Sequence, residues 1–408
     1  MLKELTISNF KSINEFSIEL GRFNVFIGEN GCGKSNILEA LAFPTAAYNG
    51  TIENDFLALR GVRISDPRHY RTGFNEGSSN KPIKISIKDD QNNLLEWIFE
   101  NDNLPFSKWR SSINLDDDQL IKEVTILSDR VKHLLYLEKL AGKNEFNEET
   151  PGFDIALKEL LEQFSNDKSL SESIVEKRIA TEVSKHTKIE DYLIYAPENF
   201  FLRNFKTEEI FSPPVGYRGE GLLSLIKIIK DNKQEQYKEI INNLALIDWF
   251  VRFDVDDRNS SGEEEFHLLD KYLDDGIKFF DIRNSNEGFL FLLFYLTLFV
   301  SDYTPSFFAI DNIDTALNPK LCSKLISLLA SLSIKHGKQV ILTTHSPSVL
   351  DGLNLNNDDE RLFVISRNAL GHTKASRIYK KPSLSGETPV KLSEQFLRGY
   401  IGGLPKNF

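Results

Sequence analysis

The residues best suited to chemistry lie in a glycine-rich run near the N-terminus. Gly28-Glu29-Asn30-Gly31-Cys32-Gly33-Lys34-Ser35 matches the phosphate-binding pattern GxxxxGK(S/T) at every specified position. Glycines let successive backbone N–H groups turn toward phosphate oxygens, and the helix that follows presents its positive N-terminus to the same anion. The pattern assigns Lys34 to the β- and γ-phosphates and the Ser35 hydroxyl to Mg²⁺. A chance glycine turn is disfavoured, because a buried-strand pattern, Phe23–Ile27, precedes the run and a helical pattern, Ile37–Tyr48, follows it.

Two later strand patterns end in polar residues that suit the same site. Ser306–Ile310 is a mostly apolar run followed by Asp311, which predicts a buried strand with a metal-binding carboxylate at its carboxyl end. Gln339–Thr343 leads into Thr344-His345-Ser346-Pro347, and a His at that strand end is suited to contact a γ-phosphate. Many strands end in Asp, and a surface or capping His is common, so both assignments depend on the glycine-rich run.

The elements that must position these residues alternate between strand and helix at both ends of the chain. This rhythm predicts one parallel sheet assembled from an N-terminal and a C-terminal segment. Ile83–Lys88 and Leu94–Phe99 read as a hairpin, whereas 101–190 is largely charged and helically periodic. We therefore expect an α/β head built from residues 1–100 and 251–408, with a mainly helical insertion at 101–250.

Composition narrows the class of protein. The chain has 408 residues and a net charge of −11, which argues against coating DNA through overall positive charge. Two cysteines form no disulfide framework, as is typical of a reducing compartment. The longest apolar run, Phe289–Val300, has 12 residues, whereas a membrane span needs about 20, so we expect a buried helix and a cytoplasmic protein without a membrane partner.

The combination GENGCGKS, apolar strand plus Asp311, and TTHSP resembles the ABC-type ATPases of the RecF, SMC and OLD group, which implies the P-loop ABC-ATPase head fold. The opening ISNFKS resembles that group's first-strand motif, and the resemblance implies that Lys11 lies near the nucleotide phosphates; the alternative is a solvated lysine at a strand end. The implied ligands are ATP and Mg²⁺, with Ser35 and Asp311 at the metal. The residues implied to hold the nucleotide are Lys11, Asn30, Gly31, Cys32, Gly33, Lys34, Ser35 and Asn36.

A second set of residues resembles the parts of that group that act across a dimer. Asn286-Glu287-Gly288 resembles the signature loop, which contacts the γ-phosphate bound by a second subunit, and 314–319 resembles the D-loop. The resemblance implies a homodimer or a higher homo-oligomer that encloses two ATP molecules. An ordinary helix N-cap built from Asn286 and Glu287 is the alternative. The segment 55–61 stands where the group has its Q-loop, but it contains no glutamine.

One departure from the group concerns hydrolysis. The residue after Asp311 is usually Glu, which polarises the attacking water, and this chain has Asn312. An amide orients a water but cannot accept its proton. We therefore predict slow hydrolysis, with Asn312 and His345 as the residues left to assist, and we expect the D-loop to direct Asp314 elsewhere.

Further segments resemble a defence-associated, AAA-like subgroup with OLD-type heads: Tyr195–Glu198, Gly219–Gly221 and Leu392–Phe408. An OLD head is often followed by a TOPRIM nuclease, whose Glu plus Asp-x-Asp constellation is not found after His345. Asp254–Asp257 matches Asp-x-Asp, but it lies before the signature segment in an acidic loop region and is not assigned as a nuclease site. The first hypothesis is an ATPase sensor or scaffold of an antiphage system that controls a separately encoded nuclease or toxin. A RecF-like repair ATPase that binds duplex DNA is the alternative, and a regulatory ATP-binding module is the third. A basic strip at 60–71 is a candidate nucleic-acid contact.

Overall fold

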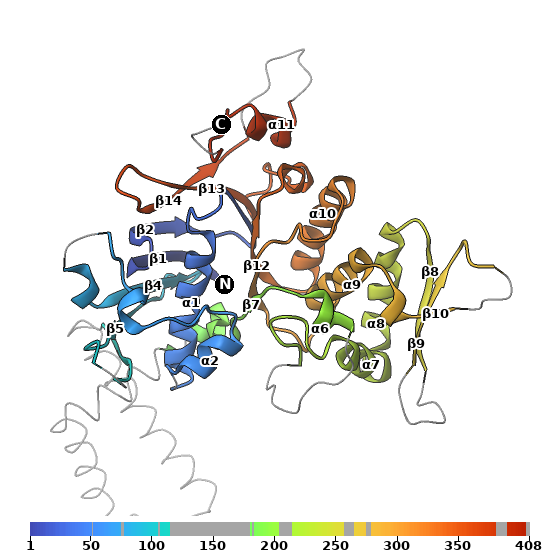
Figure 1. Cartoon of the computed structure of the whole chain (residues 1–408), viewed down its shortest axis with the longest axis horizontal. Helices are drawn as coiled ribbons and strands as arrows, with labels where there is room; N and C mark the ends of the chain where they lie inside the picture. The colour runs from blue at the N-terminus through green and yellow to red at the C-terminus, as the bar shows by residue number, and fades with distance from the viewer. Residues whose placement is uncertain are drawn as a thin grey trace, which may run out of the picture.

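The structure is a computed structural model that describes residues 1–50, 52–74, 77–104, 107–114, 180–181, 183–203, 214–256, 265–274, 279–380 and 390–404. A six-stranded sheet occupies its centre (Figure 1). The strand order is β14-β13-β3-β12-β11-β7, and all neighbours pair in parallel except β13 and β14. The strands are β3 (Phe23–Ile27), β7 (Ile194–Tyr195), β11 (Phe307–Ile310), β12 (Gln339–Thr344), β13 (Glu360–Arg367) and β14 (Thr373–Ile378).

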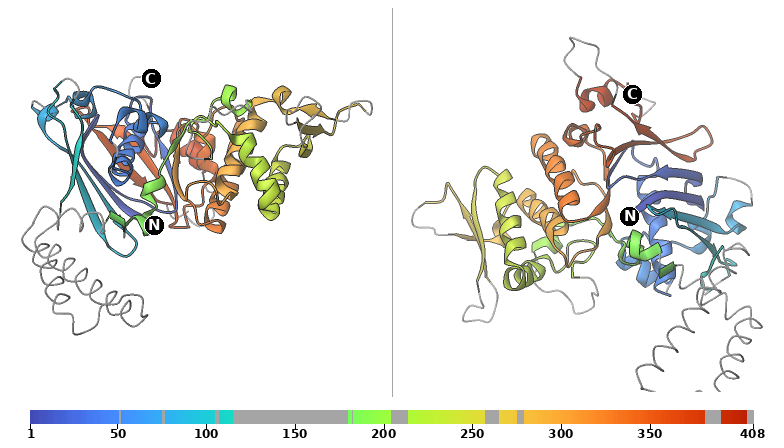
Figure 2. Two further views of the ribbon diagram at one scale, coloured as in Figure 1. Left: turned by 90° about the horizontal axis from the view of Figure 1, so that it is seen from below. Right: turned by 180° about the vertical axis from the view of Figure 1, so that it is seen from behind.

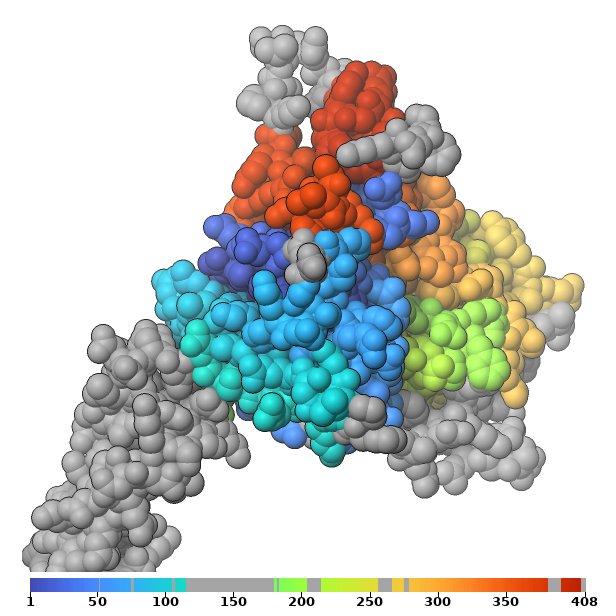
Figure 3. All heavy atoms as spheres, turned by 60° about the vertical axis from the view of Figure 1, so that its left-hand side comes forward, coloured from blue at the N-terminus to red at the C-terminus, as the bar shows by residue number. Residues whose placement is uncertain are grey.

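The N-terminal strand β3 lies between two C-terminal strands, β12 and β13. This arrangement confirms that the two ends of the chain build one parallel sheet. Figure 3 shows the consequence on the surface, where the blue N-terminal and the orange-red C-terminal segments lie against one another. Because parallel neighbours carry their carboxyl ends on the same edge, the residues that follow β3, β11 and β12 meet there.

The first two strands of the chain lie outside this parallel sheet. They belong to a separate antiparallel sheet of order β2-β1-β4-β5-β6, in which the predicted β4–β5 hairpin is confirmed. Only Lys11 and Ser12 separate β1 from β2, and so short a connection allows only antiparallel pairing. The bounds are β1 (Leu2–Phe10), β2 (Ile13–Glu19), β4 (Ile83–Asp89), β5 (Leu94–Glu100) and β6 (Arg110–Ile113).

Helices cover both faces of the parallel sheet, as Figures 1 and 2 show. On one face α1 (Lys34–Tyr48) packs with the antiparallel sheet around Phe26, whereas Val25 and Ile27 point into a second core on the other face. That second core includes α9 (Glu287–Val300), which is buried from Phe289 to Val300, as predicted. The remaining helices are α2 (Asn54–Leu59), α6 (Asn199–Arg203), α7 (Leu222–Asn232), α8 (Gln234–Asn243), α10 (Pro319–Lys335) and α11 (Leu392–Leu397). Among the described helices, none has the length and apolar character needed to cross a bilayer.

A third sheet, of order β10-β9-β8, projects at the end of the molecule farthest from β1 (Figure 1). Its strands are β8 (Phe250–Asp256), β9 (Glu265–Asp270) and β10 (Phe280–Asp281). Short 3-10 turns connect several elements: Pro67–Tyr70, Ser78–Asn80, Ile189–Asp191, Leu244–Leu246, Ile282–Asn284 and Pro347–Gly352. Much of the expected helical insertion, 115–179 with 182 and 204–213, lies outside the described residues. The described remainder supplies β6 and β7 to the two larger sheets and α6 to α8 to the second core.

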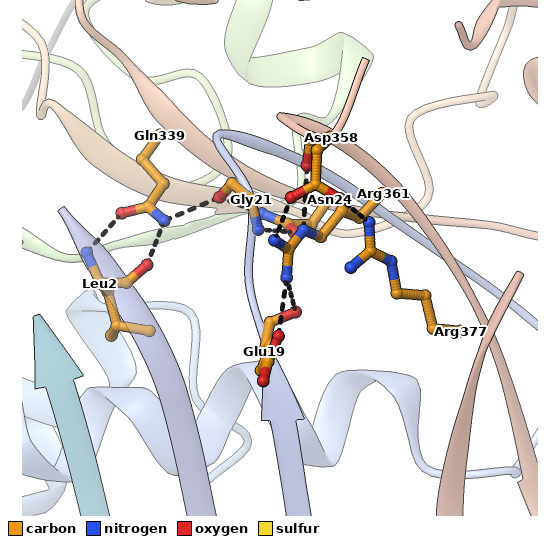
Figure 4. Close-up of polar contacts among 8 residues, drawn as sticks. All are labelled: Leu2, Glu19, Gly21, Asn24, Gln339, Asp358, Arg361 and Arg377. Carbon is orange, nitrogen blue, oxygen red and sulfur yellow. Dashed lines mark hydrogen bonds and ion pairs between the residues drawn. The ribbon is translucent and has the colours of Figure 1, made fainter. Parts of the chain in front are cut away.

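A buried polar network joins the two larger sheets at the end opposite the carboxyl edge (Figure 4). The Gln339 side chain accepts from the amide of Leu2 and donates to the carbonyls of Leu2 and Gly21, at 2.7–2.9 Å. Arg361 donates to the carbonyl of Glu19 at 2.9 Å and to the carboxylate of Asp358. These bonds satisfy backbone groups at the ends of strands and hold the ends of β1 and β2 against the starts of β12 and β13.

Candidate nucleotide-binding site

The glycine-rich run forms a loop between the end of β3 and the start of α1. Gly31 and Gly33 take φ values of +76° and +105°, a region in which a side chain would be strained. A Cβ at Gly33 would also lie 2.1 Å from the Thr373 hydroxyl, which donates to the Cys32 carbonyl at 2.9 Å. Asn30 and Gly31 are exposed at the tip of the loop. The loop therefore opens toward solvent while its base is held against β14.

Lys34, the first residue of α1, is only 5% exposed. Its ammonium donates to the carbonyls of Gly28 at 2.9 Å and Glu29 at 3.1 Å, and it lies 3.4 Å from His345 Nδ1. Burial lowers the Lys34 pKa, which the carboxylates of Asp311 and Asp314 partly offset. Within the described part of the chain this ammonium has no carboxylate in contact, so a buried positive charge faces the loop at a helix N-terminus. That arrangement fits a phosphate group.

Ser35 and Asp311 are brought together from opposite ends of the chain. The Ser35 hydroxyl donates to Asp311 Oδ2 at 2.8 Å, and the Thr343 hydroxyl donates to Asp311 Oδ1. A hydroxyl and a carboxylate beside a phosphate site are oxygen ligands that Mg²⁺ prefers. These two residues would hold the ion, which would screen the phosphate charge.

His345 lies at the end of β12, next to Lys34. Its pKa is lowered by partial burial and by the Lys34 charge, and is raised in part by Asp314 and Asp311. The imidazole is therefore neutral near pH 7 and suited to hydrogen bonding with a phosphate oxygen.

Asn312 and Asp314 follow β11 in a turn. Asn312 is exposed and has a φ of +58°. Its backbone N–H donates to the Thr343 hydroxyl at 2.9 Å. Asp314 accepts a 2.6 Å hydrogen bond from the Thr344 hydroxyl, and its charge raises the pKa of both Lys34 and His345. The bond to Thr344 turns the carboxylate toward the end of β12.

Lys11 lies beside the first turns of α1, held by a buried carboxylate that the sequence analysis did not single out. Glu39, 2% exposed, forms ion pairs with Lys11 and with Arg63 Nε. Arg63 also donates to Asn36 Oδ1 at 2.9 Å, and Asn36 donates to the Ser12 hydroxyl at 2.7 Å. The Lys11 side chain is 14% exposed, so the solvated alternative is excluded. A glutamate within the apolar run Ile37–Phe43 was the signal available in the sequence.

The segment that resembles a signature loop lies at the N-terminus of α9. Asn286 caps the helix by accepting from the amide of Phe289 at 2.9 Å, while Glu287 is exposed in the first turn. A Cβ on Gly288 would approach the Ala316 carbonyl to 3.2 Å, so the candidate signature and D-loop segments touch. A pocket of about 590 Å³ lies between them; its lining includes Trp249, Asn286, Gly288, Ala316, Asn318, Lys320 and Lys324. In the described residues, no hydrogen bond or ion pair joins 286–288 to the loop at 28–35.

Part of the basic strip at 60–71 makes contacts inside the protein. Arg60 donates to the Tyr192 carbonyl at 3.0 Å, and Arg71, 2% exposed, donates to Asn101 and Asn103. With Arg63 bound to Glu39, three of its arginines make internal contacts. In the acidic run at 254–257, Asp254 forms ion pairs with Lys230 of α7 and with Arg252 of β8. Asp257 lies outside the described residues.

The fold and the site define a P-loop ABC ATPase head. Among solved structures, an SMC head bound to the C-winged helix domain of ScpA is similar over 93% of this chain and 98% of that chain, with a TM-score of 0.54 and 15% identity. The chain belongs to the family described as "AAA domain, putative AbiEii toxin, Type IV TA system", which matches residues 23–351. Its fold is therefore that of an ABC-type ATPase head.

Two curated relatives are similar over shorter stretches. The uncharacterized protein MJECL10 of Methanocaldococcus jannaschii is 28% identical over 125 residues, which are 29% of this chain and 55% of that protein. The DNA replication and repair protein RecF of Phocaeicola vulgatus is 30% identical over 76 residues, 16% of this chain and 20% of that protein. The chain therefore spans about half of the first relative and a fifth of the second.

Proposed function

We propose that this chain binds and slowly hydrolyses Mg²⁺·ATP as the sensor or scaffold of an antiphage defence system. One observation carries the proposal: Lys34, Ser35, Asp311 and His345 converge on the loop at the N-terminus of α1. Lys34 and the first-turn amides of α1 would bind the phosphates, Ser35 and Asp311 would hold Mg²⁺, and His345 would contact the γ-phosphate. Lys11 would contribute through its ion pair with Glu39, which holds it beside the first turns of α1.

ATP-dependent dimerisation is the second part of the proposal. The pocket formed by Asn286, Gly288 and Ala316 is flanked by Lys320 and Lys324 and lies at the N-terminus of α9. A triphosphate carried by a second head would meet positive charge there. Two heads face to face would then enclose two ATP molecules. Slow hydrolysis, which we attribute to Asn312, would prolong this closed state until a partner intervenes.

The defence role is supported by the family to which the chain belongs, whose description names an AbiEii toxin and a toxin–antitoxin system. Three segments that resemble OLD-type defence ATPases point the same way: Tyr195–Glu198, Gly219–Gly221 and 392–408. We propose that the effector is a separately encoded nuclease or toxin. A cytoplasmic location accompanies this role. The RecF-like alternative is favoured by the 76-residue match to a RecF protein, and it predicts ATP-dependent binding of duplex DNA.

Nucleotide binding is tested by calorimetry with Mg²⁺·ATP on the wild type and on Lys34→Ala. We expect a Kd on the order of micromolar, weakened at least about 100-fold by Lys34→Ala, since a charged contact to phosphate is lost. Lys238→Ala is the matched control, because Lys238 is exposed and pairs with the exposed Glu235. Unchanged ATP affinity in a folded Lys34→Ala variant would refute the assignment.

The dimer and its partner are tested separately. Light scattering after size exclusion should show a doubled mass with ATP and not with ADP. Gly288→Trp, placed in the signature pocket, should abolish the doubling while leaving ATP affinity within about twofold. Mobility shift of duplex DNA that requires ATP would favour the RecF-like alternative over the defence role.

A further inference from the structure

We propose that Asp314 accepts the proton of the water that attacks the γ-phosphate, taking the place of the acid missing at position 312. The inference rests on the proposed ATPase function and names a further catalytic residue for it.

A proton acceptor is required because in-line attack by water on phosphorus releases a proton. The side chain of Asn312 cannot take it, since a carboxamide is not basic near neutral pH. Asn312 is exposed. Its backbone carbonyl accepts from the backbone N–H of Thr315 at 3.1 Å and from the Thr315 hydroxyl at 2.9 Å. The residue therefore shapes the turn, and the chemistry needs another group.

Asp311 is committed to a different task. Oδ2 of this carboxylate accepts from the Ser35 hydroxyl, and Oδ1 accepts from the Thr343 hydroxyl. Both oxygens are thus engaged on the side of the site where a metal ion would lie. A carboxylate bound to Mg²⁺ is a weak base, because the ion stabilises its charged form.

Asp314 has the position and the free oxygen that the role requires. Its Oδ1 accepts from the Thr344 hydroxyl at 2.6 Å, which ties it to the residue just before His345. Oδ2 has no hydrogen bond within the described ranges. The Asp314 charge helps to raise the pKa of both His345 and Lys34.

The groups that face Asp314 come from four elements. Lys34 lies on α1, and Thr344 and His345 lie at the end of β12. Behind the carboxylate are two neutral groups, the Tyr295 phenol of α9 and the Cys322 thiol of α10, whose pKa values the Asp314 charge helps to raise. The carboxylate is therefore partly buried between these neutral groups and the cationic side of the site.

In the proposed step, the water oxygen forms a bond to the γ-phosphorus. The bond from that phosphorus to the β,γ-bridging oxygen breaks, and its electron pair leaves with ADP. One water proton passes to Asp314, which returns it to solvent as inorganic phosphate departs. His345 holds a γ-phosphate oxygen, and Lys34 stabilises the charge that develops on the leaving oxygens.

The test compares single-turnover hydrolysis of ATP with calorimetric ATP affinity in matched variants. In Asp314→Asn the amide oxygen can still accept from Thr344, so the turn is retained while the base is lost. We expect turnover to fall at least about 100-fold with the Kd for Mg²⁺·ATP within about twofold. Asn312→Glu added to Asp314→Asn should restore turnover at least about 10-fold, since it supplies the acid usual in the family. Thr344→Val, which keeps the carboxylate and removes its tether, should cost less than Asp314→Asn. Asp302→Asn, an exposed aspartate paired with Lys233, is the control for an unchanged rate.

Each outcome bears on one claim. Turnover unchanged in Asp314→Asn, or absent from a wild type that binds ATP, overturns the role of Asp314. A loss that Asn312→Glu does not restore also overturns it, because a merely structural aspartate would behave in this way. Failure of the wild type to bind ATP would instead refute the proposed function.

Discussion

The carboxylate of Glu39 allows a quantitative test of how the nucleotide site is held together. Glu39→Gln keeps the shape of the side chain and removes its charge, which leaves the Lys11 ammonium, 14% exposed, without its ion-pair partner. The guanidinium of Arg63, at 66% exposure, is mostly solvated and loses little. Because an uncompensated buried charge costs about 3–5 kcal/mol, and the amide oxygen of Gln can still accept from Lys11, we expect a loss of about 2–4 kcal/mol in the free energy of unfolding.

The pH dependence provides a second readout. Burial already lowers the Lys11 pKa below 10.5 despite the attraction of Glu39, and without Glu39 the pKa falls further. The folded variant then binds fewer protons than the unfolded chain in the window between that lowered pKa and 10.5. Its unfolding free energy therefore rises with pH in that window, and the deficit relative to wild type is largest at neutral pH.

The assay is urea denaturation followed by circular dichroism at pH 7 and pH 9.5. In a double-mutant cycle with Lys11→Met, the two changes should couple by about 2 kcal/mol, because the second removes the charge stranded by the first. Glu235→Gln is the matched control: this glutamate is exposed and its i,i+3 pair with Lys238 should contribute less than about 0.5 kcal/mol. A loss below about 1 kcal/mol in Glu39→Gln, or additive mutations, would refute the reasoning.

Three further predictions concern backbone geometry, sheet assembly and a buried lysine. Gly33→Ala should abolish detectable ATP binding and lower the free energy of unfolding by more than about 2 kcal/mol, since the added Cβ would lie 2.1 Å from a hydroxyl. Gly31→Ala should cost about 1 kcal/mol, because nothing lies within 4 Å of its added Cβ. Calorimetry and thermal unfolding distinguish the two variants. Gln339→Leu should cost about 2–4 kcal/mol in urea denaturation by stranding three buried backbone groups, and the exposed Gln234→Leu less than about 0.5 kcal/mol; equal effects would contradict the role of the network. Lys338 donates to three backbone carbonyls near the end of α9, and burial lowers its pKa to about 8, so the folded state loses a proton at lower pH than the unfolded chain. Stability should therefore rise between pH 8 and about 10, and Lys338→Met should lack that part of the rise in parallel denaturations.

Local pattern was sufficient for the elements that carry the site. The run Phe23–Ile27 is a strand and α1 begins at Lys34, because a buried strand reads as a continuous apolar run and the glycines between them permit the turn. The apolar stretch from Phe289 to Val300 is a buried helix for the same reason. In each case the determining residues are neighbours along the chain.

Patterns that depend on distant partners are ambiguous in the sequence. The strands β1 and β2 have ordinary alternation, and nothing within them says whether they extend the parallel sheet or form another. The partner of Lys11, a glutamate 28 positions later, was visible only as a charge within an apolar run. The sequence places Asp314 in a segment that resembles a D-loop, but its orientation depends on the Thr344 hydroxyl, 30 positions away.

The sequence by itself determined the chemical types and the local conformations of the site: a glycine-rich turn, a lysine and a serine at the start of a helix, and an aspartate at the end of a strand. Those features arise from steric limits on the backbone and from apolar periodicity, which act over a few residues. The tertiary structure alone decided which strand lies beside which, and hence that Ser35 meets Asp311, that Glu39 neutralises Lys11, and that Asp314 turns toward His345. Such contacts form only when packing closes long stretches of chain, and their geometry depends on the whole core.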